Sequence, residues 1–203
     1  MIRKPYLPFL ALFALLAAMA LANFSKADSS KVEKATFAGG CFWCVEAAYQ
    51  DLDGVREVVS GFTGGTLKNP TYKGNHSGHY EVVEVTYDPS MISYQQLLDV
   101  YWVNIDPFDN GGQFCDKGPS YRSAIFVATT DQSEAAIASR KKVMEKFPDN
   151  MVYTEILDSA TFYPVEEHHQ DYYKKNPIRY KFYRTGCRRD ARLHEIWGDM
   201  AGH

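Results

Sequence analysis

The segment 39–44, Gly-Gly-Cys-Phe-Trp-Cys, constrains the fold of this chain more than any other. The pattern of residues 32–38 predicts a strand before it, and residues 45–51 predict a helix after it. Cys41 is therefore expected at a helix N-terminus, where unpaired N–H groups and the helix dipole favour an anion such as a thiolate. The two glycines allow another part of the chain to approach the sulfur closely. The short Cys-x-x-Cys spacing alone also fits a structural disulfide.

Residues 1–27 are predicted to form a signal peptide. Arg3 and Lys4 give a basic start, residues 7–22 are apolar, and small-x-small cleavage sites end at Ala22 and Ala27. The apolar run is short for crossing a bilayer, so cleavage is favoured over an uncleaved membrane anchor. We therefore expect an exported protein, in the periplasm, whose residues 28–203 fold as one catalytic domain.

Composition narrows the function classes further. The formal net charge is −3, whereas nucleic-acid surfaces are strongly basic, so no nucleic-acid partner is expected. Four cysteines are too few to build a disulfide scaffold of this size, although export permits disulfides, and a chemical role gains weight. The 14 tyrosines and 12 phenylalanines fit a filled core or a small apolar pocket. A monomer is the default expectation.

Strand and helix patterns alternate along the chain. Strands are predicted at residues 32–38, 55–62, 80–88, 123–129 and 151–157. Helices are predicted at 41–51, at 93–104 with Ser93 as cap, at 132–147 with Asp131 as cap, and near 166–174. Long loops are expected at 63–79 and 105–122. This order predicts an α+β fold: a ferredoxin-like two-layer sandwich with a mixed or antiparallel sheet, long loops and an irregular C-terminal tail from Phe162.

Several groups with acid–base chemistry are expected close to Cys41. They are Glu81, which opens the third strand, and Tyr72, Asp116 and Tyr121, which lie in the two long loops. Strand ends and loops at one sheet edge can meet around a pocket. A glutamate pressed against Phe42 and Trp43 would have a raised pKa and could donate a proton, while phenols can hydrogen-bond a polarised oxygen. Taken alone, Glu81 also fits a solvated strand carboxylate, and Asp116 a turn residue.

The histidines do not form a metal-binding pattern. His76 and His79 lie in a loop rather than on one helix face, and no cysteine has zinc-finger spacing to them. No metal is therefore expected. His168 and His169 are expected to pack or to form hydrogen bonds at the rim of the pocket.

These motifs together resemble the A-type methionine sulfoxide reductases. The resemblance covers about residues 34–198 and rests on segments 39–43, 69–72, 78–83, 85–89, 116–125, 162–170, 189–193 and 197–198. It implies reduction of the S-epimer of methionine sulfoxide to methionine, in proteins and also as the free amino acid. The implied cellular role is the repair of oxidised proteins under oxidative stress.

The resemblance also implies how the residues would act. It makes Cys41 the nucleophile, Glu81 the proton donor, Tyr72 and Tyr121 the oxygen-binding phenols with Asp116 nearby, and Phe42 and Trp43 the rings that hold the substrate methyl group. Cys41 would become a sulfenic acid and then form a disulfide with a second cysteine. A thioredoxin-like dithiol would restore the thiols from outside, without a metal or an organic cofactor.

The identity of the second, resolving cysteine is open at this point. Many family members have glycine where this chain has Cys44, which lies one helical turn from Cys41 and is favoured by local reach. Cys115, beside Asp116, and Cys187, in the tail, remain alternatives. Two other classes of protein also remain: an exported thioredoxin-type oxidoreductase, and a non-catalytic domain held together by two disulfides.

Overall fold

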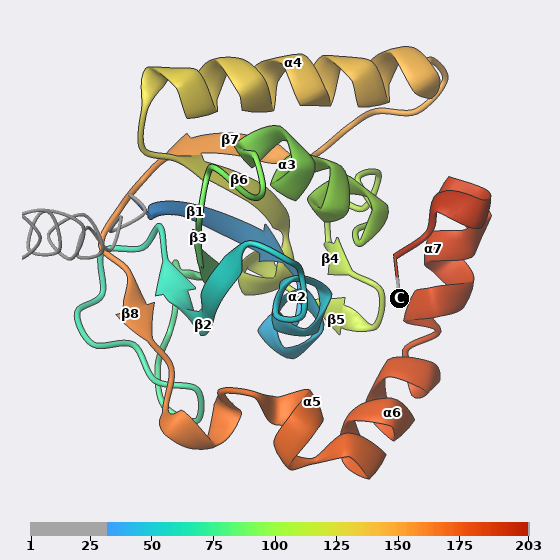
Figure 1. Ribbon diagram of the computed structural model, residues 1–203. Coiled ribbons are helices and arrows are strands. Elements are labelled where there is room, and N and C mark those ends of the chain that lie inside the picture. Colours follow the sequence, from blue (N-terminus) through green and yellow to red (C-terminus); the bar gives the residue numbers. More distant parts are fainter. Residues whose placement is uncertain (1–31, 203) are drawn as a thin grey trace, which may run out of the picture. The chain divides into compact units, whose positions relative to one another are not determined.

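The computed structural model describes residues 32–202, and the predicted signal peptide lies outside them. The strands are β1 (Glu33–Gly39), β2 (Val55–Thr63), β3 (Tyr80–Tyr87), β4 (Gly112–Gln113), β5 (Asp116–Lys117), β6 (Ser123–Val127), β7 (Glu155–Asp158) and β8 (Tyr163–Pro164) (Figure 1). The α-helices are α2 (Phe42–Tyr49), α3 (Tyr94–Val103), α4 (Thr130–Lys146), α5 (Tyr172–Lys175), α6 (Pro177–Gly186) and α7 (Arg189–Trp197). Short 3₁₀ turns are η1 (Pro119–Tyr121), η2 (Glu167–His169) and η3 (Gly198–Met200).

The main sheet has the strand order β7-β6-β1-β3-β2-β8. Its four central strands pair antiparallel, and the chain order β1-α2-β2-β3-α3-β6 makes them a ferredoxin-like core. At one edge β7 joins β6 in parallel, and at the other β8 pairs antiparallel with β2, so the sheet is mixed. The predicted α+β fold class is confirmed. A separate pair, β4 and β5, carries part of the 105–122 loop.

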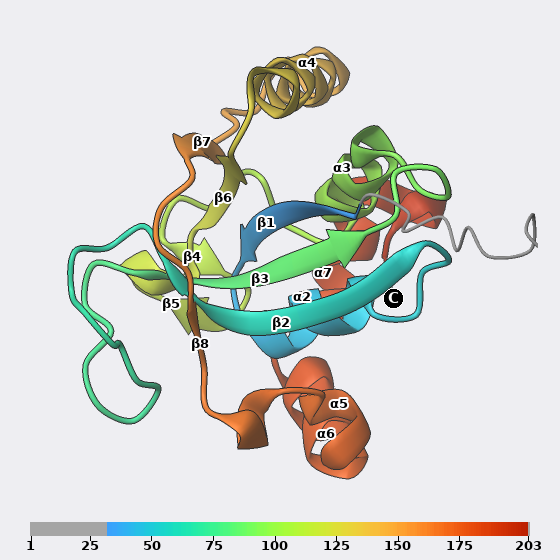
Figure 2. The same cartoon turned by 60° about the vertical axis from the view of Figure 1, so that its left-hand side comes forward.

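Helices cover one face of this sheet. α2 packs against β2 and β3, α3 against α2 and β1, and α4 against α3 and β6. Figure 2 shows α2 and α3 lying along the curved sheet, with α5 and α6 beyond α2. Because strand side chains alternate between faces, Phe37 and Val83 join the main core under the helices, whereas Ala38 and Val82 join a smaller cluster on the other face.

Some predicted boundaries move, for local reasons. The cap of α4 is Thr129 rather than Asp131, because the Thr129 hydroxyl accepts from the Gln132 N–H and Asp131 lies in the first turn. β7 begins at Glu155 and not at residue 151, since the Tyr153 N–H is already used by the Pro107 carbonyl oxygen at 2.8 Å. The Ser93 cap of α3 is confirmed and forms a capping box with Gln96.

The C-terminal tail is helical, and the prediction of an irregular tail was wrong there. α6 buries only Arg184, while its apolar residues Ile178 and Phe182 are exposed, so its pattern is not that of a helix with an apolar face on the core. A disulfide between Cys115 and Cys187 joins the end of α6 to the loop that carries β5. The tail therefore becomes a structured part of the surroundings of that loop.

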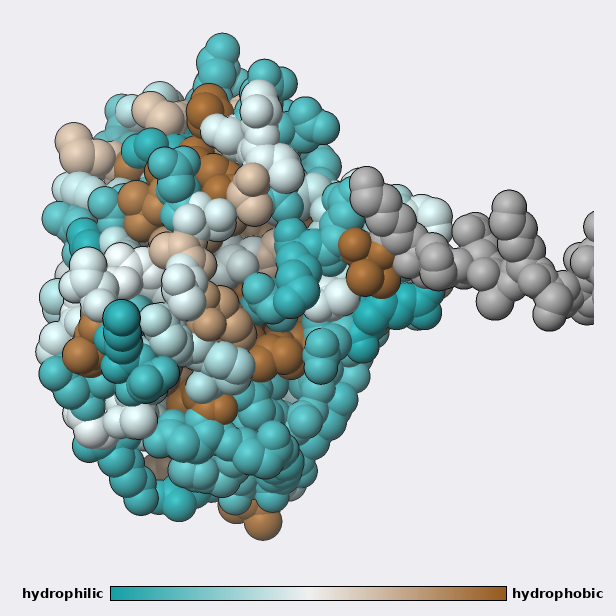
Figure 3. Space-filling model, turned by 90° about the vertical axis from the view of Figure 1, so that its left-hand side faces the viewer, coloured by the Kyte–Doolittle hydropathy of each residue, from teal (hydrophilic) through white to brown (hydrophobic). Residues whose placement is uncertain are grey.

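The surface of the described domain is mainly polar on the side seen in Figure 3. Hydrophilic residues cover most of that face, and hydrophobic ones are interspersed in small groups. Within residues 32–202, no helix combines the length and the apolar character needed to cross a membrane.

Candidate active site

Cys41 lies in the turn between β1 and α2 and is the N-cap residue of that helix. Its side chain is almost fully buried. The turn requires glycine at position 40, because φ there is 84° and a Cβ would lie 2.5 Å from the Cβ of Gln113. The part of the chain that was expected to approach the two glycines closely is thus the 105–122 loop.

Glu81 reaches the start of α2 from β3. It is 1% exposed, and its Oε2 accepts a hydrogen bond from the Phe42 N–H at 3.2 Å. Burial raises the pKa of Glu81 to about 8, and the Phe42 hydrogen bond opposes that shift only in part. Glu81 is therefore not a solvated strand carboxylate, and it keeps its proton near neutral pH.

Two phenols and a second carboxyl, all from the long loops, lie close to Cys41 and Glu81. Burial, followed by the charges of Glu81 and Cys41, raises the pKa of Tyr72 to about 12. Burial and the charge of Glu81 likewise raise the pKa of Tyr121, so both phenols remain neutral donors. Asp116 is partly buried, and burial raises its pKa. The structure thus brings these three residues together with Cys41 and Glu81.

The two aromatic residues after Cys41 differ in accessibility. Phe42 is fully buried and packs against Tyr72 and His169, so in this conformation it supports the site from behind. Trp43 is partly exposed, and its ring stacks on Tyr172 with centroids 3.7 Å apart. Its indole N–H donates to His169 Nδ1 at 3.3 Å. The expected hydrogen bonding of His169 at the site is therefore observed.

The other predicted loop histidines face backbone oxygens. His76 Nδ1 lies 3.2 Å from the carbonyl oxygen of Thr71, and His79 Nε2 lies 2.8 Å from that of Leu67. Among residues 32–202, one group has ligand atoms close enough to share a metal ion. It consists of Cys115, Asp116 and Cys187, whose two sulfurs are joined to each other.

The structure divides the cysteines into two pairs. Cys115 and Cys187 form the disulfide, whereas Cys41 and Cys44 are free, buried and hydrogen-bonded to each other. Cys115 and Cys187, the two alternatives for the resolving cysteine, are therefore bonded to each other. Cys44 is left as the free thiol within reach of Cys41.

The charge within the free pair differs from the expectation. Burial raises the pKa of Cys41, whereas the hydrogen bond from Cys41, followed by the charges of Arg189 and Arg184, lowers the pKa of Cys44 to about 6. These shifts disfavour the expected thiolate at Cys41 and favour a thiolate at Cys44. Glu81 already accepts from the first N–H of α2, and it also disfavours negative charge on Cys41.

Residues of α6 complete the site, and the sequence analysis missed them. The Tyr183 hydroxyl donates to Asp116 Oδ2 and also contacts Cys41. The Tyr180 hydroxyl faces Cys44 and also accepts from Arg184 Nη1 at 3.2 Å. Tyr180, Tyr183 and Arg184 are spaced so that they lie on one face of a helix. A helix predicted at this position would have identified them as a group.

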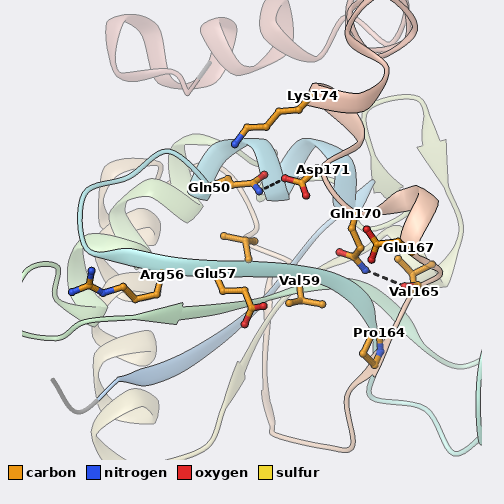
Figure 4. A pocket seen from close by; sticks show the side chains of 11 residues that line it. Gln50, Arg56, Glu57, Val59, Pro164, Val165, Glu167, Gln170, Asp171 and Lys174 are labelled. Atoms are coloured by element: carbon orange, nitrogen blue, oxygen red, sulfur yellow. Dashed lines mark hydrogen bonds between the residues drawn. The ribbon is translucent and has the colours of Figure 1, made fainter. Parts of the chain in front are cut away.

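A polar cavity of about 550 Å³ lies apart from these groups. It opens between the end of α2, β2 and segment 164–174, and Figure 4 shows Gln50 hydrogen-bonded to Asp171 across it. None of the predicted site residues lines it. The predicted site residues lie instead at the start of α2, where Cys41 and Glu81 are buried and Tyr72, Asp116 and Tyr121 are partly exposed.

The fold and the site define a thiol-dependent oxidoreductase: a buried dithiol at a helix start, beside a protonated carboxyl and neutral phenols. A profile of the family "Peptide methionine sulfoxide reductase" matches residues 33–201. A relative from Caulobacter vibrioides, "Peptide methionine sulfoxide reductase MsrA 2", is 50% identical over 190 residues, covering 92% of this chain and 96% of its own. One from Bacillus subtilis is 47% identical over 175 residues, covering 84% and 98%.

Solved structures agree. Methionine sulfoxide reductase A of Corynebacterium diphtheriae superposes with a TM-score of 0.67 and 31% identity, covering 75% of this chain and 78% of that one. The reduced form of Mxr1 from Saccharomyces cerevisiae gives 0.66 and 28%, covering 75% and 90%. The chain therefore belongs to the peptide methionine sulfoxide reductase family. It is an oxidoreductase that reduces methionine sulfoxide to methionine.

Proposed function

We propose that Cys41 and Glu81 carry the reduction of the S-epimer of methionine sulfoxide, in oxidised proteins and as the free amino acid. The observation that supports this most strongly is the buried, protonated Glu81 at the helix start that Cys41 caps. A sulfoxide oxygen must gain a proton as its bond to sulfur breaks, so a neutral carboxyl beside a sulfur nucleophile suits the reaction. The biological role that follows is the repair of oxidised proteins.

The first step transfers one oxygen atom. The Cys41 sulfur attacks the sulfoxide sulfur while Glu81 protonates the oxygen. A transient bond between the two sulfurs forms as the substrate's S–O bond breaks. That sulfur–sulfur bond then breaks, an S–O bond to Cys41 forms, and methionine leaves. Cys41 is oxidised to a sulfenic acid, the substrate sulfur is reduced by two electrons, and the thiol proton of Cys41 restores the proton of Glu81.

The remaining residues hold the substrate. Tyr72 and Tyr121 donate hydrogen bonds to the polarised oxygen, with Asp116 beside them. Their raised pKa values keep both phenols as donors through the neutral range. The exposed part of Trp43 contacts the substrate methyl group, and Phe42 supports this wall from behind.

In the second step Cys44 resolves the sulfenic acid. Its hydrogen bond with Cys41 and the pairing of Cys115 with Cys187 favour this assignment. An S–S bond between Cys44 and Cys41 forms, the S–O bond breaks, and the oxygen leaves as water. An external thioredoxin-like dithiol then returns the disulfide to thiols, which requires no organic cofactor. Mxr1 from Saccharomyces cerevisiae has been solved in complex with Trx2, a precedent for such a partner in that protein.

The test is a single turnover of the reduced protein with each sulfoxide epimer, followed by mass spectrometry of methionine release and of the disulfide formed. We expect the S-epimer to give about one methionine per wild-type chain and a bond between Cys41 and Cys44. Cys41→Ser should release none, and Cys44→Ser should release methionine once without recycling by a dithiol protein. Turnover in Cys41→Ser, or normal recycling in Cys44→Ser, would contradict the respective role.

We also propose export to the periplasm with removal of residues 1–27. The support is the basic start and the apolar run of the sequence alone. Expression with the natural N-terminus in a Gram-negative host, fractionation and N-terminal sequencing test the proposal. A mature chain beginning just after Ala22 or Ala27 is expected in the periplasmic fraction, and an intact N-terminus in the membrane or cytoplasm would contradict it.

A further inference from the structure

Two buried arginines face the buried thiol of Cys44. Cys44 is 1% exposed, and Arg184 and Arg189, brought by α6 and α7, are 7% and 2% exposed. A buried guanidinium needs nearby acceptors or negative charge to offset the loss of hydration. The partners of each arginine therefore indicate how much of its charge remains to act on Cys44.

Arg184 is linked to Cys44 through a phenol. Its Nε donates to Asp190 Oδ1 at 2.7 Å and its Nη2 lies 2.6 Å from the same oxygen, so Asp190 offsets part of its charge. Its Nη1 donates to the Tyr180 oxygen at 3.2 Å. The Tyr180 hydroxyl in turn donates to Cys44. The hydrogen bonds thus run from Arg184 to Tyr180 and from the Tyr180 hydroxyl proton to the Cys44 sulfur.

Arg189 is held by neutral groups. Its Nη2 donates to the carbonyl oxygens of Gly39 and Asn104 at 3.2 and 2.7 Å, and its guanidinium lies 4.3 Å from the centre of the Phe114 ring. These contacts fix the position of the charge without neutralising it. Cys44 and Asp116 are the groups whose anionic forms it favours.

We propose that Arg184 and Tyr180 are positioning residues for the resolving step, holding Cys44 as a thiolate directed at Cys41, with Arg189 adding to the positive field. This inference rests on the proposed resolving role of Cys44. The thiolate attacks the sulfenic sulfur of Cys41, the S–S bond forms and the S–O bond breaks. Cys44 is oxidised, the Cys41 sulfur is reduced, and the departing hydroxide takes the proton of Glu81 and leaves as water.

The arginines matter most after the first step. The groups that face Cys44 are Cys41 from α2, Glu81 from β3, Tyr180, Tyr183 and Arg184 from α6, and Arg189 from α7. In the reduced site the largest cause of the lowered pKa of Cys44 is the hydrogen bond from Cys41. That S–H donor no longer exists once Cys41 carries oxygen, so Tyr180 and the two arginines then sustain the thiolate.

The experiment measures disulfide formation by rapid quench and mass spectrometry during a single turnover with the S-epimer, from acid to alkaline pH. Methionine release is followed in the same samples. The variants are Arg184→Met, Tyr180→Phe and the charge-preserving Arg184→Lys. Arg179→Met, on the exposed side of α6, is the matched control.

We expect Arg184→Met to slow disulfide formation by up to about fourfold at pH 7 and by more at lower pH, with no such loss in methionine release. A thiol with a higher pKa has a smaller thiolate fraction, although each thiolate is more nucleophilic. The pH midpoint of the resolving step should therefore rise by about one to three pH units, and the deficit should disappear at alkaline pH. Tyr180→Phe should show a smaller change in the same direction, while Arg184→Lys restores most of the rate and Arg179→Met behaves as the wild type.

The outcomes separate the two levels of the proposal. An unchanged midpoint in both Arg184→Met and Tyr180→Phe, or an equal loss at every pH, overturns the positioning role and leaves Cys44 as the resolving cysteine. A wild-type disulfide that does not contain Cys44 overturns both the positioning role and the resolving role. The Tyr180→Phe variant removes a single oxygen, so it keeps the test valid if Arg184→Met does not fold.

Discussion

At the scale of single residues, three neighbouring side chains of the candidate site differ in how readily they hold a proton. Glu81 has a pKa of about 8 because it is buried, so near neutral pH it holds a proton that a leaving oxygen can take. Burial raises the pKa of Cys41, whereas hydrogen bonding and the arginines lower that of Cys44 to about 6. A protonated carboxyl from β3 and a thiolate in the first turn of α2 can therefore coexist at the start of that helix.

Replacing Glu81 by glutamine tests the proton donor. Glu81→Gln preserves the shape and removes the acid, so the rate of methionine release in a single turnover should fall about 100-fold or more. In the wild type the active form is the protonated one, so the rate should be full below pH 8 and fall as the pH rises through about 8. The variant should lose this alkaline fall. A wild-type rate that rises through pH 8, with an unaffected variant, would remove Glu81 from the role.

The turn before Cys41 offers a test of packing. At Gly40 a Cβ would meet both a positive φ of 84° and the Gln113 side chain, whereas Gly78, with a φ of 80°, has open space around its Cβ position. Gly40→Ala should therefore lower the free energy of unfolding by about 3 kcal/mol, and the control Gly78→Ala by about 1 kcal/mol. Urea unfolding measures both. Equal losses would mean that contact with Gln113 does not matter.

At the scale of elements, the periodic segments were predictable and the irregularly patterned ones were not. β1, β3 and α3 have alternating or helical apolar patterns, and their positions were predicted to within a residue or two. The position of Glu81 beside Cys41 followed from that order. α6 buries only Arg184, and α7 buries Arg189 on the same face as Leu193 and Trp197, so each helix has an arginine at a core-facing position. This departs from the apolar pattern by which helices are recognised, and Tyr180, Tyr183 and Arg184 were missed for that reason.

The start of α3 provides a test at this scale. The Ser93 hydroxyl accepts from the Gln96 N–H at 3.2 Å, and the Gln96 side chain accepts from the Ser93 N–H at 2.9 Å. Ser93→Ala should lower the free energy of unfolding by about 1 kcal/mol in urea. The control Gln95→Ala lies at a half-buried position next to the capping box and removes one side-chain hydrogen bond to Asp99, so it should have a smaller effect. A matching loss in the control would attribute the change to helix propensity and not to the cap.

The whole domain is closed by a link between distant parts of the chain. The disulfide joins Cys115, next to Asp116, to Cys187 at the end of α6, across 72 positions of sequence. α6 in turn contributes the Tyr183 hydroxyl that donates to Asp116. The C-terminal helices therefore contribute side chains to the candidate site, and the disulfide joins two cysteines other than Cys41 and Cys44.

Removing this link tests the division of the cysteines. The double variant Cys115→Ser/Cys187→Ser should lower the free energy of unfolding by up to about 4 kcal/mol, because a cross-link over 72 positions restricts the unfolded chain strongly. If Cys44 resolves, the variant should still be recycled by a dithiol protein, since the pair at the start of α2 is intact. Recycling that stops after one methionine, in a variant whose circular dichroism is native, would instead place Cys115 or Cys187 in the electron path.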